Sequence, residues 1–159
     1  MVQSELSILE AEIQAFRQRE VDIGKLREVV DVLEASASEK CEGENAREWF
    51  YTDRVRLGTA LATAAGVFLR VGLVEQAQKE ARAVLTCWLS FPAAENQDSW
   101  TEKIARLPKA IALSVVARAS GEPPGGTDYQ AALGYTRALP PREKKRYRRL
   151  FEYCEVPVG

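Results

Sequence analysis

Residues 57–89 read LGTALATAAGVFLRVGLVEQAQKEARAVLTCWL and hold the most regular apolar pattern in the chain. Apolar and small residues recur at intervals of three and four before Gly72, which is the spacing of one helix face, and resume after it. The two stripes are Leu57, Leu61, Ala65 and Phe68, and then Val74, Ala77, Ala81, Val84 and Trp88. Because so short a turn joins them, we expect two antiparallel helices. The first could begin near residue 46, with a weak point at Gly58.

Helical spacing also fills the N-terminal part of the chain. One amphipathic helix is predicted over residues 6–16, from Leu6, Leu9, Ile13 and Phe16. A second is predicted over residues 23–37, with Asp22 as its start signal and Gly43 as its end. We expect these two helices to pack as a hairpin.

The C-terminal part is predicted to be helical as well. A helix is expected to start at Asp98 or Ser99, and Pro108 either kinks or restarts it. Residues 121–126, GEPPGG, predict a loop, and a short helix is expected over residues 129–139. Pro140 and Pro141 follow this helix, and a last helix is expected to start there.

These elements predict one all-α domain of 159 residues, built from antiparallel helical hairpins stacked as a solenoid or a small bundle of six to eight helices. No window shows sustained alternation of apolar and polar residues, which strands would require. The predicted parts are an acidic hairpin over 1–43, a central hairpin over 46–91, a second hairpin over 98–139, and a basic C-terminal helix and tail over 140–159.

The composition excludes several kinds of active site. Histidine is absent, which excludes Ser-His-Asp and Cys-His triads and the HExxH zinc site. The three cysteines form no CxxC pair, so we expect reduced thiols. The carboxylates of residues 42–53 could do acid–base work, but helix capping explains them better. No phosphate-binding loop is present. We therefore expect no catalytic residue, no metal and no cofactor.

Targeting and membrane signals are missing from the sequence. The N-terminal 20 residues alternate acids with apolar residues, unlike a signal peptide. The longest weakly polar stretch, residues 57–69, is shorter than the roughly 20 residues that a bilayer requires. We expect a cytoplasmic protein with no membrane span.

The central stretch resembles the tetratricopeptide repeat family. The matching residues are Ala65, Phe68, Gly72, Val74, Ala77, Ala81 and Val84. The sequence departs from the family where Leu61 replaces the usual tryptophan, where Ala65 replaces glycine, and at the late Pro92. A fainter second copy runs through residues 110–138 with an inserted loop.

This resemblance implies a concave surface that holds a peptide or a partner helix. Carried over by position, its groove residues are Thr59, Ala62, Gly66, Leu69 and Arg70. The alternative is that these small residues only mark where two helices of an ordinary bundle cross.

A run of cations near the C-terminus is the second candidate site. It consists of Arg142, Lys144, Lys145, Arg146, Arg148 and Arg149. On one helix, Tyr147, Leu150, Phe151 and Cys154 would share the docking face and leave the cations outside. Such a helix could bind nucleic-acid phosphates, an anionic membrane surface or an acidic protein, or could simply be a solvated face.

The charge is distributed unevenly along the chain. Residues 1–50 carry 6 Lys and Arg against 12 Asp and Glu, whereas residues 101–159 carry 11 against 6. Ends of opposite sign can attract each other, attract two different partners, or drive head-to-tail self-association. The sequence thus predicts a non-catalytic protein–protein interaction module, an adaptor or assembly factor. The alternative is a nucleic-acid-associated protein that uses its basic C-terminal helix.

Overall fold

The computed structural model describes residues 10–16, 20–42, 51–85 and 99–158, and every regular element in these ranges is helical. The helices are α2 (Ile23–Glu42), α3 (Tyr51–Arg70), α4 (Val74–Ala83), α5 (Ser99–Ala119), α6 (Thr127–Ala138), α7 (Pro141–Arg146) and α8 (Arg148–Cys154), with a further helical stretch at 10–16. The predicted all-α class is confirmed.

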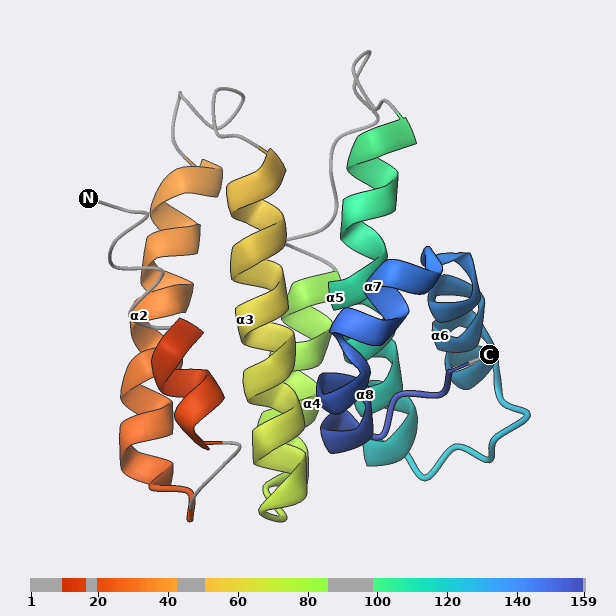
Figure 1. Ribbon diagram of the computed structural model, residues 1–159. Helices are drawn as coiled ribbons and strands as arrows, with labels where there is room; N and C mark the ends of the chain where they lie inside the picture. Colours follow the sequence, from red (N-terminus) through yellow and green to blue (C-terminus); the bar gives the residue numbers. More distant parts are fainter. Residues whose placement is uncertain (1–9, 17–19, 43–50, 86–98, 159) are drawn as a thin grey trace.

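Helix α3 is the centre of the bundle. It packs against α2 on one side, against α4 and α5 on the other, and against α8 (Figure 1). The predicted stripe of Leu57, Leu61, Ala65 and Phe68 is buried, but burial extends around the whole helix, and from residue 57 to residue 68 only Thr59 is partly accessible. A helix that is apolar or small on all sides can be enclosed in this way. It passes through Gly58 without a break.

The turn at Gly72 joins α3 to α4 as predicted. Gly72 has a φ of +89°, a left-handed conformation that glycine adopts without steric cost. Its N–H donates to Leu69 O at 3.1 Å and the Leu73 N–H donates to Phe68 O at 2.9 Å, which together make a Schellman cap.

The stripe predicted on α4 is confirmed in its middle and wrong at its start. Ala77, Ala81 and Val84 are buried, whereas Val74 is 41% exposed. Val74 is the first residue of α4, at the tip of the hairpin, where α3 has already ended and supplies no surface to cover it. Trp88, the last residue of that stripe, lies outside the described residues.

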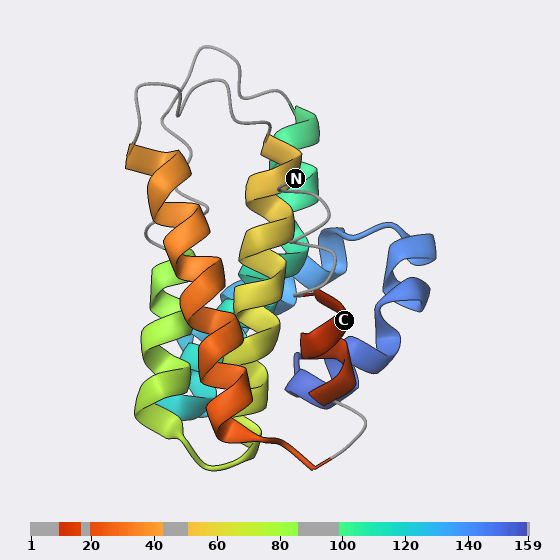
Figure 2. The ribbon, with the colours of Figure 1, turned by 90° about the vertical axis from the view of Figure 1, so that its left-hand side faces the viewer.

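The N-terminal elements follow the predicted pattern where they are described. Asp22 caps α2, because its Oδ1 accepts the Lys25 N–H at 3.1 Å. The pattern of the second segment is Ile23, Leu26, Val30, Leu33 and Ala37. The structure buries Ile13, Phe16, Leu26, Val30 and Leu33 of the two segments in the core, whereas Ile23, the first residue of α2, is half-buried. Figure 2 shows the stretch 10–16 beside α2, on the side toward α7 and α8. Leu6 and Leu9 lie outside the described residues.

Helix α5 starts at Ser99, one of the two predicted positions, and continues through Pro108, which is buried. The helix is therefore not restarted at the proline. It ends in a second Schellman cap at Gly121, whose φ is +69°, and the predicted loop follows. The Glu122 carboxylate accepts the Asp128 and Tyr129 N–H groups, at 3.2 and 2.9 Å, and so caps α6 from the loop.

The single basic helix predicted at the C-terminus is wrong, because the chain breaks at Tyr147 into α7 and α8. Tyr147 has φ −100° and ψ 9°, outside the helical range. The change of direction lets Leu150, Phe151 and Cys154 enter the core, where α8 packs on α3 and α5. Tyr147 does not share their buried face and stays half-buried.

One carboxyl group is enclosed in the bundle. Glu80 of α4 is 1% exposed, and its Oε1 accepts a hydrogen bond from Gln76 Nε2 at 2.9 Å. No donor within the described part of the chain reaches its Oε2. Burial, followed by the hydrogen bond and the negative charge of Glu34, raises the pKa of Glu80 from 4.5 to about 8, against the smaller opposing effects of Lys79 and Gln76. Glu80 is therefore protonated at neutral pH.

This pKa predicts how stability depends on pH. Between about pH 4.5 and 8, the unfolded chain loses the Glu80 proton while the folded chain keeps it. The free energy of unfolding should therefore fall as the pH rises through this window, by at most ~1.4 kcal/mol per pH unit. Below the window both states are protonated and the full stability is present. Glu80→Gln should remove this decline from urea unfolding measured across the window.

The matched control is Glu75→Gln, which changes an exposed carboxylate on the same helix. It should keep the decline seen in the wild type. Parallel pH profiles for the wild type and Glu80→Gln would show that Glu80 is ionised in the fold.

Candidate functional site

The predicted groove face of α3 is partly covered by the chain's own C-terminal helix. Ala62 and Gly66 are buried, Thr59 and Leu69 are half-buried, and Arg70 is exposed. A Cβ at Gly66 would lie 2.6 Å from Cys154 Sγ, so α8 sits directly on this glycine. The structure thus brings Gly66 and Arg70 to α8, and places Thr59 in a separate cleft.

Two arginines hold the end of α8 against the core. The Arg70 guanidinium lies over the Tyr153 ring, 4.6 Å from its centroid, and donates to Tyr153 O at 3.0 Å. From α5, Arg118 donates to Cys154 O at 3.2 Å and pairs with Glu155. The last carbonyls of a helix have no partner within the helix and carry its negative dipole end, so cations stabilise them.

The chain leaves α8 through a strained residue. Glu155 has a φ of +52°, and among the described residues it is the only non-glycine with a positive φ. The Val156 N–H donates to Phe151 O at 2.9 Å, which makes a third Schellman cap. Glutamate in this conformation costs about 1–2 kcal/mol. The cap turns the tail back, and the Thr136 hydroxyl fixes it by donating to Pro157 O at 2.8 Å.

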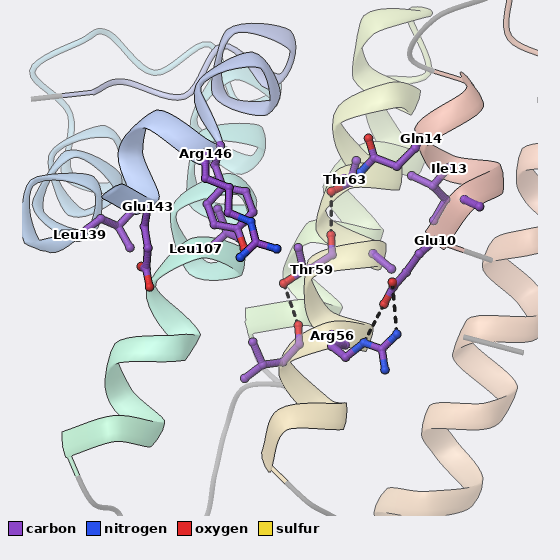
Figure 3. Close-up of a pocket in the computed structure, with 14 residues that line it drawn as sticks. Glu10, Ile13, Gln14, Arg56, Thr59, Thr63, Leu107, Leu139, Glu143 and Arg146 are labelled. Carbon is purple, nitrogen blue, oxygen red and sulfur yellow. Dashed lines mark hydrogen bonds and ion pairs between the residues drawn. The ribbon is translucent and has the colours of Figure 1, made fainter. Parts of the chain in front are cut away.

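A cleft of about 700 Å³ separates the stretch 10–16 from α7 (Figure 3). On one wall Arg56 is paired with Glu10, with Nε to Oε1 at 3.1 Å and Nη2 to Oε2 at 3.3 Å. On the other wall stand Glu143 and Arg146. Each wall therefore offers both signs of charge.

The two threonine hydroxyls that line this cleft already donate hydrogen bonds. The hydroxyls of Thr59 and Thr63 donate to the carbonyls of Val55 and Thr59, both at 2.7 Å. These are local hydrogen bonds within α3, as threonine makes in helices. No nucleophile activated by a base is seen among the residues that line the cleft.

The structure divides the six predicted cations among different surfaces. Five of them are exposed and Lys144 is half-buried. Arg146 faces the cleft of Figure 3, with its guanidinium 5.4 Å from the centroid of the Tyr147 ring. Lys144, Lys145 and Arg148 line a second pocket, and Arg142 and Arg149 line neither of the two.

We name this second pocket the basic pocket, of about 520 Å³, lined by Lys144, Lys145, Arg148, Phe151, Glu152, Glu155, Val156 and Val158. Of its apolar residues, Phe151 and Val156 are buried and Val158 is 51% exposed. Its two carboxylates already have cationic partners, since Glu152 accepts from Arg148 Nε at 3.1 Å and Glu155 pairs with Arg118. The pocket therefore offers apolar contact beside cations.

The cations of this pocket could be singled out from the sequence, but its apolar residues could not. Val156 and Val158 follow the last helix, and the only signal for them was a pair of apolar residues beyond a helix end. Their position depends on the left-handed turn at Glu155, and glutamate does not predict such a turn.

Comparison with protein-family models, with curated proteins and with solved structures finds no match for this chain. Within the described ranges, no three His, Cys, Asp or Glu side chains are grouped so as to hold a metal ion. No helix in the part of the chain that the structure describes is long and apolar enough to cross a membrane.

The contact between Gly66 and Cys154 predicts the effect of one methyl group. Gly66→Ala should lower the free energy of unfolding in urea by about 1–2 kcal/mol, because overpacking a buried contact costs more than the ~1 kcal/mol that alanine gains over glycine in a helix.

Gly134→Ala in α6 is the control, since nothing lies within 4 Å of a Cβ added there. It should raise the free energy of unfolding by up to about 1 kcal/mol. Equal gains for the two substitutions would mean that α8 does not rest on Gly66.

Proposed function

We propose that this chain is a non-catalytic protein–protein interaction module, an adaptor or assembly factor, that binds an acidic amphipathic segment through the basic pocket. The observation that carries the proposal is a pocket in which the exposed side chain of Val158 lies beside three cations. A partner side chain against Val158 would gain hydrophobic burial, and acidic neighbours of that side chain would meet Lys145.

The basic pocket is a better candidate than the groove face of α3. A peptide on that face would have to displace α8 from Gly66 and break the contacts of Arg70 and Arg118 with its carbonyls. The resemblance of residues 57–89 to a tetratricopeptide repeat agrees with a scaffold role for α3 and α4. We assign the partner to the solvent-exposed side of α7 and α8, opposite the side on which α8 packs against α3.

Nucleic acid is the second candidate partner, and the exposure of Arg142, Lys145 and Arg149 favours it. No ion pair within the described part of the chain involves these three residues. The aromatic ring of the basic pocket, however, belongs to Phe151, which is 1% exposed and offers no face on which a base could stack.

Affinity capture from a native cell extract tests this proposal. We expect the wild-type chain to retain a defined set of proteins after nuclease treatment and Lys145→Gln/Val158→Asn to lose them. Arg142→Gln, which removes a cation outside the pocket, should keep them.

Nucleic-acid binding predicts a different pattern. Nuclease would release the captured material, and Arg142→Gln would weaken capture as much as Lys145→Gln/Val158→Asn. Phosphate contacts by about six cations would lose ~10³-fold in affinity between 50 and 200 mM salt. That pattern, or capture equal for the wild type and the pocket variant, would contradict the proposal.

A further inference from the structure

We infer that a proton shared by Glu34 and Glu80 holds α2 against the bundle, and that α2 detaches locally when this proton is lost. The two residues, which we call the carboxyl pair, come from different helices, Glu34 from α2 and Glu80 from α4. The inference concerns conformational control of the chain and is independent of the partner proposed above.

The position of Glu80 on α4 directs its side chain toward α2. At 100° per residue, Glu80 lies roughly 60° to one side of the buried Ala77, whereas Gln78 lies roughly 100° to the other side. Gln78 Nε2 donates to the hydroxyl of Ser120 at 3.1 Å, just beyond the end of α5. Helix α5 is therefore on the Gln78 side, and Glu34 of α2 approaches Glu80 from the opposite side, where α2 lies beside α4 (Figure 2).

The hydrogen bonds around Glu80 do not suit an ionised carboxylate. The residue is 1% exposed, and its Oε1 accepts from Gln76 Nε2 at 2.9 Å, but no donor within the described ranges reaches its Oε2. A buried charge without such partners is strongly unfavourable, so the neutral acid is favoured. A proton on Oε2 can be donated to the Glu34 carboxylate, which gives Oε2 the partner that it otherwise lacks.

The charged groups around Glu80 act in the same direction. Residues 57–69 of α3 and 110–117 of α5 contain no Asp, Glu, Lys or Arg. Among the described residues, the charges that act on Glu80 are those of Glu34, which opposes its ionisation, and of Lys79, whose effect is opposite and smaller. Ionisation of Glu80 would therefore place two like charges between α2 and α4.

Helix α2 is the element that can relieve this repulsion at the lowest cost. Among the described helices it packs mainly on α3, and less extensively than α4 or α5 does. Its detachment would expose Glu80 to water and leave α3, α4 and α5 packed together. Elements with few buried contacts open locally at a lower free energy than the whole fold. The open form would uncover an apolar strip of α2 formed by Leu26, Val29, Val30 and Leu33.

The direction of the pH effect follows from the two states of Glu80. With α2 in place the pKa of Glu80 is raised to about 8, whereas exposure to water returns it toward 4.5. The equilibrium constant for opening of α2 should therefore increase with pH, by at most about tenfold per pH unit between about 4.5 and 8, and should level off above this window.

Native-state hydrogen exchange of the full-length chain from about pH 5 to about pH 8, corrected for the chemical exchange rate, tests the inference. We expect the amides of Val29, Val30 and Leu33 to open more readily than those in the middle of α3. Their opening constant should increase with pH by up to about tenfold per unit.

Two variants and a control connect this dependence to the carboxyl pair. Glu80→Gln, which cannot ionise, should make opening of α2 independent of pH. Glu34→Gln removes a negative charge and offers an N–H donor to an ionised Glu80, so its opening constant should level off at a lower pH than in the wild type. Asp31→Asn changes an exposed acid of α2 three residues before Glu34 and should behave as the wild type.

Three results would overturn the inference. The first is a set of α2 amides that open only together with those of α3, because α2 would then not detach on its own. The second is local opening of α2 that does not change with pH in the wild type. The third is a pH dependence that persists unchanged in both Glu80→Gln and Glu34→Gln.

Discussion

The close approach of α8 to α3 at Gly66 is the constraint on which the rest of the structure depends. Only a residue without a Cβ allows Cys154 to lie where it does. The small residues around Gly66 let α3 be enclosed on all sides, so that α2, α4, α5 and α8 use one central helix as a common surface. A bundle arranged in this way needs close packing at its centre rather than large side chains.

The docking of α8 determines what the C-terminal segment shows to solvent. Once Leu150, Phe151 and Cys154 are buried, Arg148 and Arg149 of the same helix face solvent. Arg70 and Arg118 add charge-assisted hydrogen bonds to the end of α8, and the strained turn at Glu155 directs Val156 and Val158 to the side of Lys145. Local strain of this kind persists only where the surrounding contacts compensate for it.

Much of the fold could be predicted from local rules. The glycine turn at Gly72, the cap at Asp22 and the loop at residues 121–126 depend on neighbours in the sequence, and the structure confirms them. The break at Tyr147 and the course of the tail depend on contacts with α3, α5 and α6, which no local pattern contains. Gly66 and Arg70 could be predicted to contact another segment. The sequence pattern, however, does not distinguish a segment of a partner from a helix of the chain itself.

Native-state hydrogen exchange tests the central role of the α3–α8 contact most directly. If α8 is part of the core built on Gly66, the hydrogen-bonded amides of Phe151 and Cys154 should open with a free energy close to that of the amides in the middle of α3. Amides in α8 that exchange as fast as those of an unfolded segment, while α3 stays protected, would contradict the account.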